Sequence, residues 1–347
     1  MTRLDIRLFD ANLADRTVLR EYYELMVSCA ADWSDEAPSE YDAAIERLRN
    51  PAPGLGPFVQ WAVYLDDRLV GFEKIGFPEQ ENSHIGFVEI DIHPDVRRRG
   101  IGTEMLHCAL PTLAARGRTE VEVWSVTEGS PAEKWAVRHG FERVHTTVLQ
   151  RLLIDTVEPG LWDVDAPAGY HAVSWIGRAP EGLVASYARA RGAMDDAPLE
   201  DSTYRSPRWT VERVRADEDE RQRSKVELRV VAAVDDAGEV AGFTEVNIRE
   251  YRTDLAFQGD TAVTDVHRGN GLGRFVKARM AAWLRTDFPG LRCVLTSTAA
   301  VNTQMIRVNG LIGYVTSRRT LVMNSGLSNL KTRLSGDRDG ASGRTSA

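Results

Sequence analysis

The chain has 347 residues, and its 43 lysines and arginines against 51 aspartates and glutamates leave a formal net charge of −8. That length is enough for two domains of roughly 150 residues each. The negative charge argues against a general nucleic-acid-binding protein, although it leaves room for an anionic ligand at a local site. The N-terminal residues are charged, and no run approaches the roughly 18 apolar residues of a membrane helix, so we expect neither a signal peptide nor a membrane span.

Cysteine and histidine usage predicts a cytoplasmic protein without a metal site. Cys29, Cys108 and Cys293 lie far apart and form no C-x-x-C pair, as expected of small buried residues in a reducing compartment. The seven histidines form no H-E-x-x-H motif and no ligand-like cluster. We therefore predict a cytoplasmic location, no metal and no disulfide.

The first half of the chain alternates strand-like and helix-like segments. The predicted strands cover residues 6–9, 60–65, 69–77, 86–93, 120–126 and 144–154. The predicted helices cover residues 13 or 15 to 30, 41–49, 103–115 and 131–138. Asn12 or Asp15 is placed to cap the first helix. Residues 159–169, rich in proline, glycine and aspartate, predict a linker.

The second half repeats this order with an irregular insert at residues 194–208. The predicted strands cover residues 170–175, 228–234, 240–249, 261–263 and 291–296, and the predicted helices cover residues 180–193, 208–225 and a segment from residue 274 onward. The charges of the helix at residues 208–225 are most simply a solvated face, and a wall of a substrate site is the alternative. After about residue 325 little remains to bury, so we expect a mobile tail.

Two turns of the form R-x-x-G-x-G each lie between a predicted strand and a predicted helix. They consist of Arg97, Arg98, Arg99, Gly100, Ile101 and Gly102, and of Arg268, Gly269, Asn270, Gly271, Leu272 and Gly273. A glycine-rich turn that opens a helix leaves amide groups unpaired at the positive end of the helix dipole, where phosphate binds. The turns are 171 residues apart (268 − 97), and the same offset relates Glu89 to Asp260. This offset indicates an internal duplication.

Other phosphate-binding motifs fit less well. A Walker A loop would continue with Lys-Ser/Thr, but Thr103 and Arg274 follow the two turns. A dinucleotide fingerprint needs G-x-G-x-x-G, and the run from Gly269 and Gly271 reaches Arg274 instead. NAD binding is therefore the weaker alternative, and a helix entry with an incidental glycine turn is the other.

At these turns the sequence resembles the GNAT acyltransferase superfamily, whose acyl-CoA pyrophosphate loop reads (Q/R)-x-x-G-x-(G/A). The second half is the closer match, because Asn302, Met305, Asn309 and Gly313-Tyr314 are similar to the family's N-x-x-M…N…G-F segment. More narrowly, the chain resembles actinobacterial tandem-GNAT proteins, an arrangement also seen in mycothiol synthase. The resemblance covers nearly the whole chain except the tail.

The resemblance implies a mixed α/β (α+β) fold of two tandem GNAT domains, each a twisted mixed sheet flanked by helices. We expect the boundaries at residues 1–158, 159–169 (linker), 170–325 and 326–347 (flexible tail), in a monomer or homodimer. Residues 31–55 would border the acceptor site, and an ordinary surface helix pair is the alternative.

The implied function is transfer of an acyl group from acetyl-CoA or another acyl-CoA to an amine of a small molecule, such as a natural-product intermediate. One alternative donor is the phosphopantetheine thioester of an acyl carrier protein. A non-catalytic CoA-binding module is another alternative. No nucleic acid or membrane is expected as a partner.

The resemblance also assigns roles to residues. Both turns would hold the donor, together with Val263 and Ile92 at the strand ends and Asn302 after the fifth strand. Asp260 and Glu89, with Asp91 next, are candidate bases that remove the proton of the amine; carboxylates that are satisfied by the backbone or that hold substrate by charge are the alternative.

A tyrosine that protonates the leaving thiolate is common in the family. This chain departs from that pattern, because Trp135 and Ala136 occupy the family's position in the first half, and Val308 and Asn309 occupy it in the second. Ser130 stands where the second half has Asn302, and it could instead be a helix cap. We expect the second copy to do the chemistry and the first mainly to support it.

Overall fold

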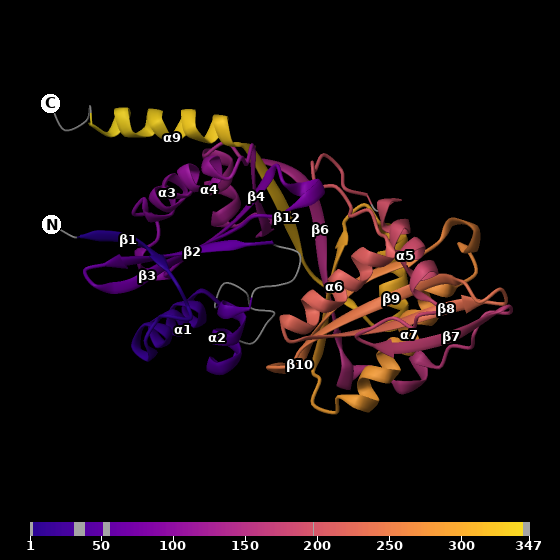
Figure 1. The fold of residues 1–347 in the computed structure, drawn as a ribbon. Helices are drawn as coiled ribbons and strands as arrows, with labels where there is room; N and C mark the ends of the chain where they lie inside the picture. Colours follow the sequence, from indigo (N-terminus) through magenta and orange to yellow (C-terminus); the bar gives the residue numbers. More distant parts are fainter. Residues whose placement is uncertain (1–2, 31–38, 51–55, 197, 343–347) are drawn as a thin grey trace. The chain divides into compact units, whose positions relative to one another are not determined.

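The computed structural model describes residues 3–30, 39–50, 56–196 and 198–342 (Figure 1). The chain divides into two compact units, one of residues 1–145, 200–205 and 320–347, the other of residues 146–199 and 206–319. Of the helices in the described residues, none has the length and apolar character needed to cross a lipid bilayer.

The first unit is a mixed sheet with helices on both faces. Its helices are α1 (Arg16–Ala30), α2 (Tyr41–Arg49), α3 (Ile101–Ala115), α4 (Pro131–Arg138) and α9 (Leu327–Ser342). Its strands are β1 (Leu4–Phe9), β2 (Phe58–Leu65), β3 (Arg68–Gly76), β4 (Ile85–Ile92) and β5 (Glu120–Thr127), followed by part of β12 (Val315–Gly326). They lie in the order β1-β2-β3-β4-β5-β12, and β4 and β5 run parallel.

The second unit repeats this plan. Its helices are α5 (Val184–Gly192), α6 (Val211–Arg223), α7 (Leu272–Asp287) and α8 (Thr303–Ile312). Its strands are β7 (Tyr170–Ile176), β8 (Val226–Asp235), β9 (Val240–Arg249), β10 (Arg252–Val263) and β11 (Cys293–Ala299), with part of β6 (Glu142–Leu153). They lie in the order β7-β8-β9-β10-β11-β6, and β10 and β11 run parallel.

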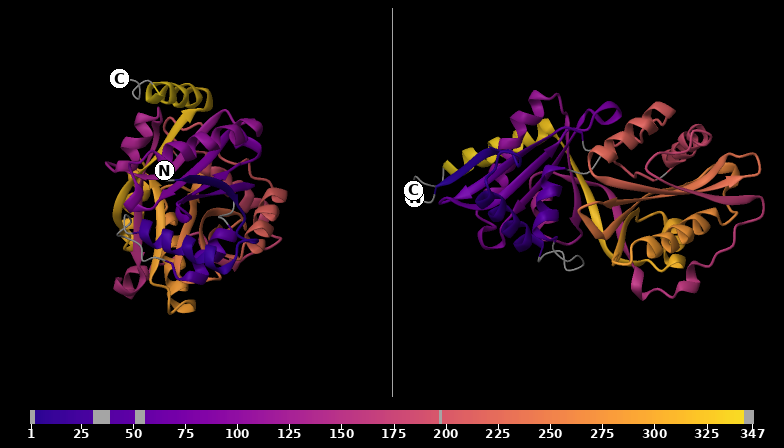
Figure 2. Two further views of the ribbon diagram at one scale, coloured as in Figure 1. Left: turned by 90° about the vertical axis from the view of Figure 1, so that its left-hand side faces the viewer. Right: turned by 60° about the horizontal axis from the view of Figure 1, so that its bottom comes forward.

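Each unit has a hydrophobic core on both faces of its sheet. In the first unit, Tyr22 and Leu25 of α1 pack on one face, and Leu106 and Leu113 of α3 pack on the other. In the second unit, α5 packs on one face and α7 on the other, as the right-hand view of Figure 2 shows. Each sheet therefore separates a face covered by α1 or α5 from a face covered by α3 or α7.

The last strand of each sheet comes from the other half of the sequence. Residues 320–326 of β12 pair with β5, and residues 147–153 of β6 pair with β11. The expected boundaries at residues 158 and 170 therefore differ from the compact units. Because β6 and β12 follow equivalent helices and have similar alternating patterns, the pattern alone does not say which sheet each of them completes.

The C-terminal segment also differs from the mobile tail that we expected. Leu327, Leu330 and Leu334 of α9 are 6%, 0% and 2% exposed and belong to the core of the first unit. Their spacing of three and four residues places them on one helix face. Because the tail's composition is mostly polar, composition alone did not indicate this short stripe of leucines.

The segment that we expected to be a linker is also packed against the protein, because Trp162 is buried and donates its Nε1 hydrogen to the carbonyl oxygen of Ile312 at 2.8 Å.

Candidate functional site

Each R-x-x-G-x-G turn opens a helix with a glycine in the left-handed conformation. Gly100 precedes α3 with a φ of 81°, and Gly271 precedes α7 with a φ of 78°, and neither position has a side-chain cap. The first two amides of each helix, residues 101–102 and 272–273, donate no hydrogen bond within the described part of the chain. Unpaired amides at the positive end of a helix dipole bind anions. Both turns thus have the expected geometry.

The motif arginines hold the turns in place. The Nε of Arg97 donates to the carbonyl oxygen of Ile92 at 2.9 Å, and the Nε of Arg268 donates to that of Val263 at 3.2 Å. Arg268 also pairs with Asp196 at 2.7 Å and with Asp265 at 2.8 Å. Two carboxylates therefore pair with Arg268, one of the residues of the turn that we expected to hold the donor. Its observed contacts are those of a residue that positions the turn.

The two turns differ in strain and in what lies beside them. Arg98 has a left-handed φ of 64°, whereas the equivalent residue, Gly269, has a φ of 83°. A β-carbon on Gly102 would lie 3.9 Å from the indole of Trp135, and one on Gly273 would lie 4.0 Å from Val308. A non-glycine residue in the left-handed region costs about 1–3 kcal/mol. The backbone of the second unit's turn is therefore less strained, and the side chain beside its last glycine, Val308, is smaller than Trp135 in the first unit.

Beside each turn, the two parallel strands stop pairing. β4 pairs with β5 only over Ile85–Phe87, although it continues to Ile92. β10 pairs with β11 only over Leu255–Phe257, although it continues to Val263. The facing backbone groups beyond these pairs are available to an extended ligand that carries amides. Each unit thus combines an anion-binding helix start with an opening between strands.

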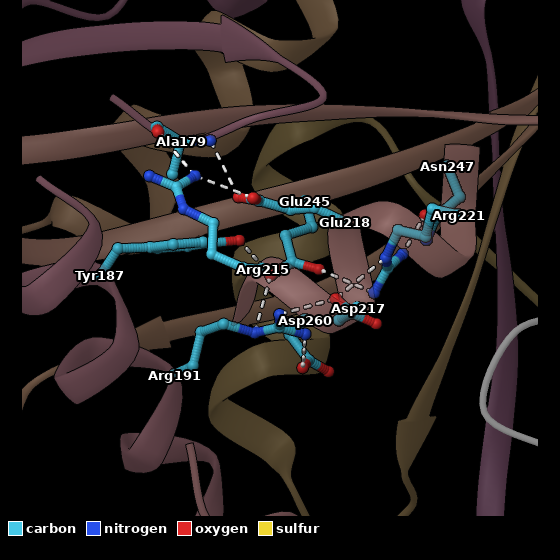
Figure 3. Close-up of polar contacts among 10 residues, drawn as sticks. All are labelled: Ala179, Tyr187, Arg191, Arg215, Asp217, Glu218, Arg221, Glu245, Asn247 and Asp260. Atoms are coloured by element: carbon cyan, nitrogen blue, oxygen red, sulfur yellow. Dashed lines mark hydrogen bonds and ion pairs between the residues drawn. The ribbon is translucent and has the colours of Figure 1, made fainter. Parts of the chain in front are cut away.

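In the second unit, Asp260 borders a buried network of charges on the α5 and α6 face of the sheet (Figure 3). The guanidinium of Arg191 lies 3.2 Å from Glu245, 2.8 Å from Asp217 and 4.0 Å from Asp260. The Tyr187 hydroxyl donates to Glu245 at 2.6 Å. Arg191, Glu245 and Tyr187 are almost wholly buried, whereas the side chain of Asp260 is 38% exposed. Asp260 is thus the member of the network that a ligand can reach.

The surroundings of Asp260 make its carboxylate a usable base. Desolvation and the neighbouring charge of Glu245 raise its pKa, Arg191 and Arg221 oppose them, and the result is a pKa of about 6. A carboxylate that titrates close to neutrality is ionised at pH 7 yet more basic than an ordinary aspartate. This environment suits the role that we expected for Asp260.

The charges of α6 form a solvated face only in part: residues 212, 219 and 223 are exposed, but other charges of the helix face inward. Glu218 is 5% exposed and accepts a hydrogen bond from the amide of Ala179 at 2.8 Å, and Arg215 pairs with it at 2.8 Å. Arg221 lies 3.1 Å from Asp217 and also contacts Asn247 (Figure 3). Charged side chains face the sheet because they are paired there. The alternative, a helix that borders the site of Asp260, agrees with these contacts.

In the first unit, Glu89 and Asp91 lie two residues apart on β4 and share one face of the sheet. Glu89 pairs with Lys74 of the neighbouring strand at 3.0 Å. Desolvation would raise the pKa of Glu89, but the charges of Lys74 and Arg47 outweigh it and keep that pKa below its usual value. Desolvation and the charge of Glu89 raise the pKa of Asp91 to about 7. Asp91 is thus the better base of this unit.

Asn302 and Ser130 are both helix caps. The Asn302 side-chain oxygen accepts from the amide of Met305 at 3.0 Å, and the Ser130 hydroxyl accepts from that of Glu133 at 3.2 Å. The alternative that we weighed for Ser130 is therefore confirmed. Asn302 has the same role at the start of α8. Because its side-chain oxygen is used in the cap, its side-chain nitrogen is the group left to contact an acyl-CoA.

Three buried polar residues near these sites were not among the predicted ones. Glu245 lies on the largely buried strand β9, next to the apolar run of residues 240–243, and Lys277 lies on the apolar face of α7 with Met280 and Leu284. In each case, a charge inside an apolar pattern was the available signal. Arg191 gave no such signal, because it sits in a basic stretch that is typical of a helix C-terminus. Of the proposed wall at residues 31–55, residues 31–38 and 51–55 lie outside the described residues, and residues 41–49 form α2.

Comparison with known proteins places this geometry in a family. The profile of the acetyltransferase (GNAT) family matches residues 19–148 and 194–310. A mycothiol acetyltransferase of Parafrankia sp. (strain EAN1pec) is 28% identical over 110 residues, which are 32% of this chain and 32% of the relative. The chain thus matches about a third of that relative's length.

Solved structures resemble the chain over nearly its whole length. A tandem GNAT protein from the clavulanic acid biosynthesis pathway has a TM-score of 0.76 and 25% identity, over 94% of this chain and 99% of the other. A GCN5-related N-acetyltransferase from Sphaerobacter thermophilus has a TM-score of 0.68 and 16% identity, over 93% and 96% of the two chains. The second likeness concerns the fold alone.

Proposed function

The chain belongs to the acetyltransferase (GNAT) family, and from this premise we propose that it is an N-acyltransferase that moves an acyl group, most simply acetyl, from acyl-CoA to an amine of a small molecule. One observation carries the proposal: in the second unit the helix start at Gly271, the opening beyond Phe257 and the exposed carboxylate of Asp260 occur together on β10 and the turn that follows it. The helix start would bind the phosphates, the opening between the strands would hold the arm that carries the thioester, and Asp260 would accept the proton of the amine.

The residues of each unit fit an acyl-CoA donor. The unpaired amides at the start of α7 would bind the pyrophosphate. The free edge of β10 up to Val263 would hydrogen-bond the amides of the pantetheine arm. The thioester supplies an acyl group that is already activated, so the protein needs only to position it and to manage protons.

Asp260 would take the proton from the attacking amine. An alkylamine has a pKa near 10, so it is protonated at neutral pH and cannot attack. The carboxylate of Asp260, exposed and with a pKa of about 6, can accept this proton directly or through a water molecule. The neutral amine then attacks the thioester while both substrates are bound, and no acyl-enzyme is required.

The second unit is proposed to do this chemistry, and the first to bind a donor mainly in support. The less strained turn at Gly269 and the smaller neighbour at Gly273 favour the second unit. In the first unit Glu89 is paired with Lys74. The exposed Arg98 and Arg99 beside that turn still attract an anion, so binding without turnover is physically reasonable.

The acceptor is proposed to be a small molecule of specialised metabolism. This rests on the names of two similar proteins, one a mycothiol acetyltransferase and the other from the clavulanic acid biosynthesis pathway. The carrier-protein donor remains the second candidate, because the paired charge of Arg268 offers little to the additional phosphate of CoA.

A screen of amines with acetyl-CoA, read out as free thiol, tests the proposal. Thiol release that depends on one amine supports it. Turnover with an acylated carrier protein but not with acetyl-CoA would favour the second candidate. Binding of CoA without acyl transfer to any amine would reject catalysis and leave a CoA-binding module.

A further inference from the structure

Lys277 of α7 is a buried lysine without a carboxylate partner among the described residues. It is 3% exposed, and its Nζ makes one long contact, 3.5 Å to the hydroxyl of Thr261. The Tyr314 ring lies 5.3 Å away. Burial lowers the pKa of Lys277 to about 7, and no neighbouring charge offsets this effect. A buried ammonium with unused donors is costly unless something else pairs with it.

The surroundings of Lys277 are polar, neutral and linked to the opening between β10 and β11. The Thr261 and Thr244 hydroxyls are 2.7 Å apart, and Gln258 donates to Thr244 at 2.8 Å. The Tyr314 hydroxyl donates to Gln258 at 3.4 Å. Both Gln258 and Thr261 lie beyond Phe257, the last residue of β10 that pairs with β11. Lys277 therefore lies under the open stretch of β10.

A second unsatisfied group lies on α8 and contacts β11. Asn309 is 0% exposed and donates to Gln150 at 2.8 Å and to Thr298 at 3.4 Å, but its Oδ1 has no hydrogen-bond partner within the described residues. Thr298 lies beyond Leu295, the last residue of β11 that pairs with β10. Each strand of the opening is thus contacted by a buried polar side chain, Lys277 or Asn309, that can form further hydrogen bonds. Such groups are expected where a ligand binds.

The first unit is apolar at the same places. The residue 171 positions before Lys277 is Leu106, and the one before Thr261 is Ile90 (277 − 106 = 261 − 90 = 171). Counted from Gly140-Phe141 and Gly313-Tyr314, Asn309 corresponds to Ala136. Leu106 and Ala136 belong to the hydrophobic core. The fold therefore does not require a lysine here, and only the second unit has one.

Lys277 and Asp260 lie on opposite faces of β10. Asp260 faces Arg191 of α5, whereas the next residue, Thr261, contacts Lys277 of α7. An amine that approaches Asp260 and a sulfur that leaves toward Lys277 would thus be on opposite sides of the thioester carbonyl. Such a division keeps the base apart from the acid in an addition–elimination, in which the amine adds to the carbonyl before the sulfur leaves.

We propose that Lys277 is the catalytic acid of the second unit and gives its proton to the departing sulfur. The proposal rests on the acyl transfer proposed above. Asp260 first takes the proton of the ammonium and passes it to solvent, and the neutral amine nitrogen then bonds to the carbonyl carbon and loses its second proton to Asp260. The C–S bond then breaks, its electron pair goes to sulfur, and an ammonium proton of Lys277 converts the thiolate to the thiol. The protonated Asp260 releases its proton to solvent and the neutral lysine takes one up, so the enzyme returns to its starting state and atoms and charges balance.

This assignment accounts for two features that are otherwise unexplained. The positions from which the family's tyrosine would act hold Val308 and Asn309, so α8 offers no acid there. An acid that titrates near neutrality is well matched to a thiolate whose conjugate thiol has a pKa of about 8.5. The developing negative charge would also give the buried ammonium its missing partner.

The first experiment compares leaving groups in the intact chain. Lys277→Met removes the ammonium at similar length, and Leu106→Met is the matched control in the first unit. Donors are the acetyl thioesters of N-acetylcysteamine, an alkyl thiol, and of 4-nitrothiophenol, whose thiolate leaves without a proton. We expect Lys277→Met to slow the alkyl donor by about 10²-fold and the aryl donor by less than about threefold. An equal loss with both donors would overturn the proposal.

The second experiment does not depend on turnover. The thiolate absorbance of bound CoA, followed against pH, gives the pKa of its thiol in the complex. We expect a lower thiol pKa with the wild-type chain and with Leu106→Met than with Lys277→Met. Identical values would overturn the role of Lys277 and leave the acyltransferase proposal intact. If the wild-type chain transferred no acyl group, the proposed function would fail, and the titration would still show whether Lys277 faces the sulfur.

Discussion

Equivalent carboxylates in the two units have different chemical properties because their neighbours differ. Asp260 and Glu89 are related by the repeat, yet Asp260 stands beside Glu245 whereas Glu89 is paired with Lys74. Desolvation and the like charge of Glu245 raise the pKa of Asp260, whereas the charges of Lys74 and Arg47 outweigh desolvation and hold the pKa of Glu89 below its usual value. The duplication therefore preserved the position of the carboxylate but not its basicity.

Replacing Asp260 should slow transfer most near neutral pH. Asp260→Asn removes the base, and we expect kcat/KM to fall by about 10²-fold near pH 7. The wild-type rate should decline below about pH 6 as Asp260 is protonated, and this limb should be absent from the variant. The deficit should shrink toward pH 9.5, because free amine is then abundant with an amine pKa near 10. Asp91→Asn, which removes the better base of the first unit, serves as the control, and a larger loss in that variant would place the chemistry in the first unit.

The same substitution should stabilise the protein at neutral and alkaline pH. Folding raises the pKa of Asp260 from 3.8 to about 6, so the folded state favours the protonated form. The stability that Asp260 contributes is fully present below pH 3.8 and is lost as the pH rises through about 6. Asp260→Asn, which stays neutral, should therefore unfold at a higher temperature than the wild type at pH 8 and at a similar one at pH 4. A lower melting temperature at pH 8 would contradict this electrostatic picture.

Among the elements, those with a regular pattern were predictable from the sequence. Helix α4 begins and ends at the expected residues, Pro131 and Arg138, and the strands expected at residues 60–65 and 69–77 are β2 and β3, which pair with each other. Helix α6 was predicted only in part, because several of its charges are paired inward and a sequence pattern contains no information about partners on other elements. The two glycine turns were recognisable because a left-handed residue before a helix favours glycine.

Equivalent substitutions in the two glycine turns test which unit binds CoA and which unit catalyses acyl transfer. Gly100→Val and Gly271→Val each impose about 1–2 kcal/mol of backbone strain, and neither new β-carbon would meet another atom within 4 Å. Their effects on folding should therefore be similar, while each blocks the approach of an anion to its own helix. We expect calorimetry to find two CoA sites in the wild type and one in each variant.

The acyltransferase activity of the two glycine variants should differ, although their effects on folding are expected to be similar. Gly271→Val should lose nearly all activity, and Gly100→Val should retain most of it. The opposite outcome, an inactive Gly100→Val with a nearly normal Gly271→Val, would show that the first unit is the catalytic one. A single CoA site in the wild type would show that one turn does not bind the donor.

At the scale of the whole molecule, the sequence predicted the repeat but not how its strands are shared. The expectation of two tandem GNAT domains is confirmed by the family match and by the likeness to a tandem GNAT protein. The offset of 171 residues showed two copies, and residues 320–326 nevertheless complete the sheet of the first unit. Short alternating strands pair with any suitable edge, so this choice depends on tertiary packing that a pattern does not record.

Separating the halves should therefore destabilise both. A fragment of residues 1–158 would contain β5 but not the residues of β12 that pair with it, and it would also lack the buried leucines of α9. A fragment of residues 159–347 would contain β11 without its partner β6. Each sheet would have an unpaired edge and each core a missing side, which costs more than one marginally stable domain provides.

We expect each fragment alone to exchange its amide hydrogens rapidly, and an equimolar mixture to form a protected one-to-one complex with acyltransferase activity. The intact chain, cut only at the linker by a specific protease, is the control, because it retains both strands in place. The alternative outcome is that β6 folds back onto β5 within the first fragment. Protection of that fragment equal to its protection in the intact chain would show that the strand exchange is not needed for stability.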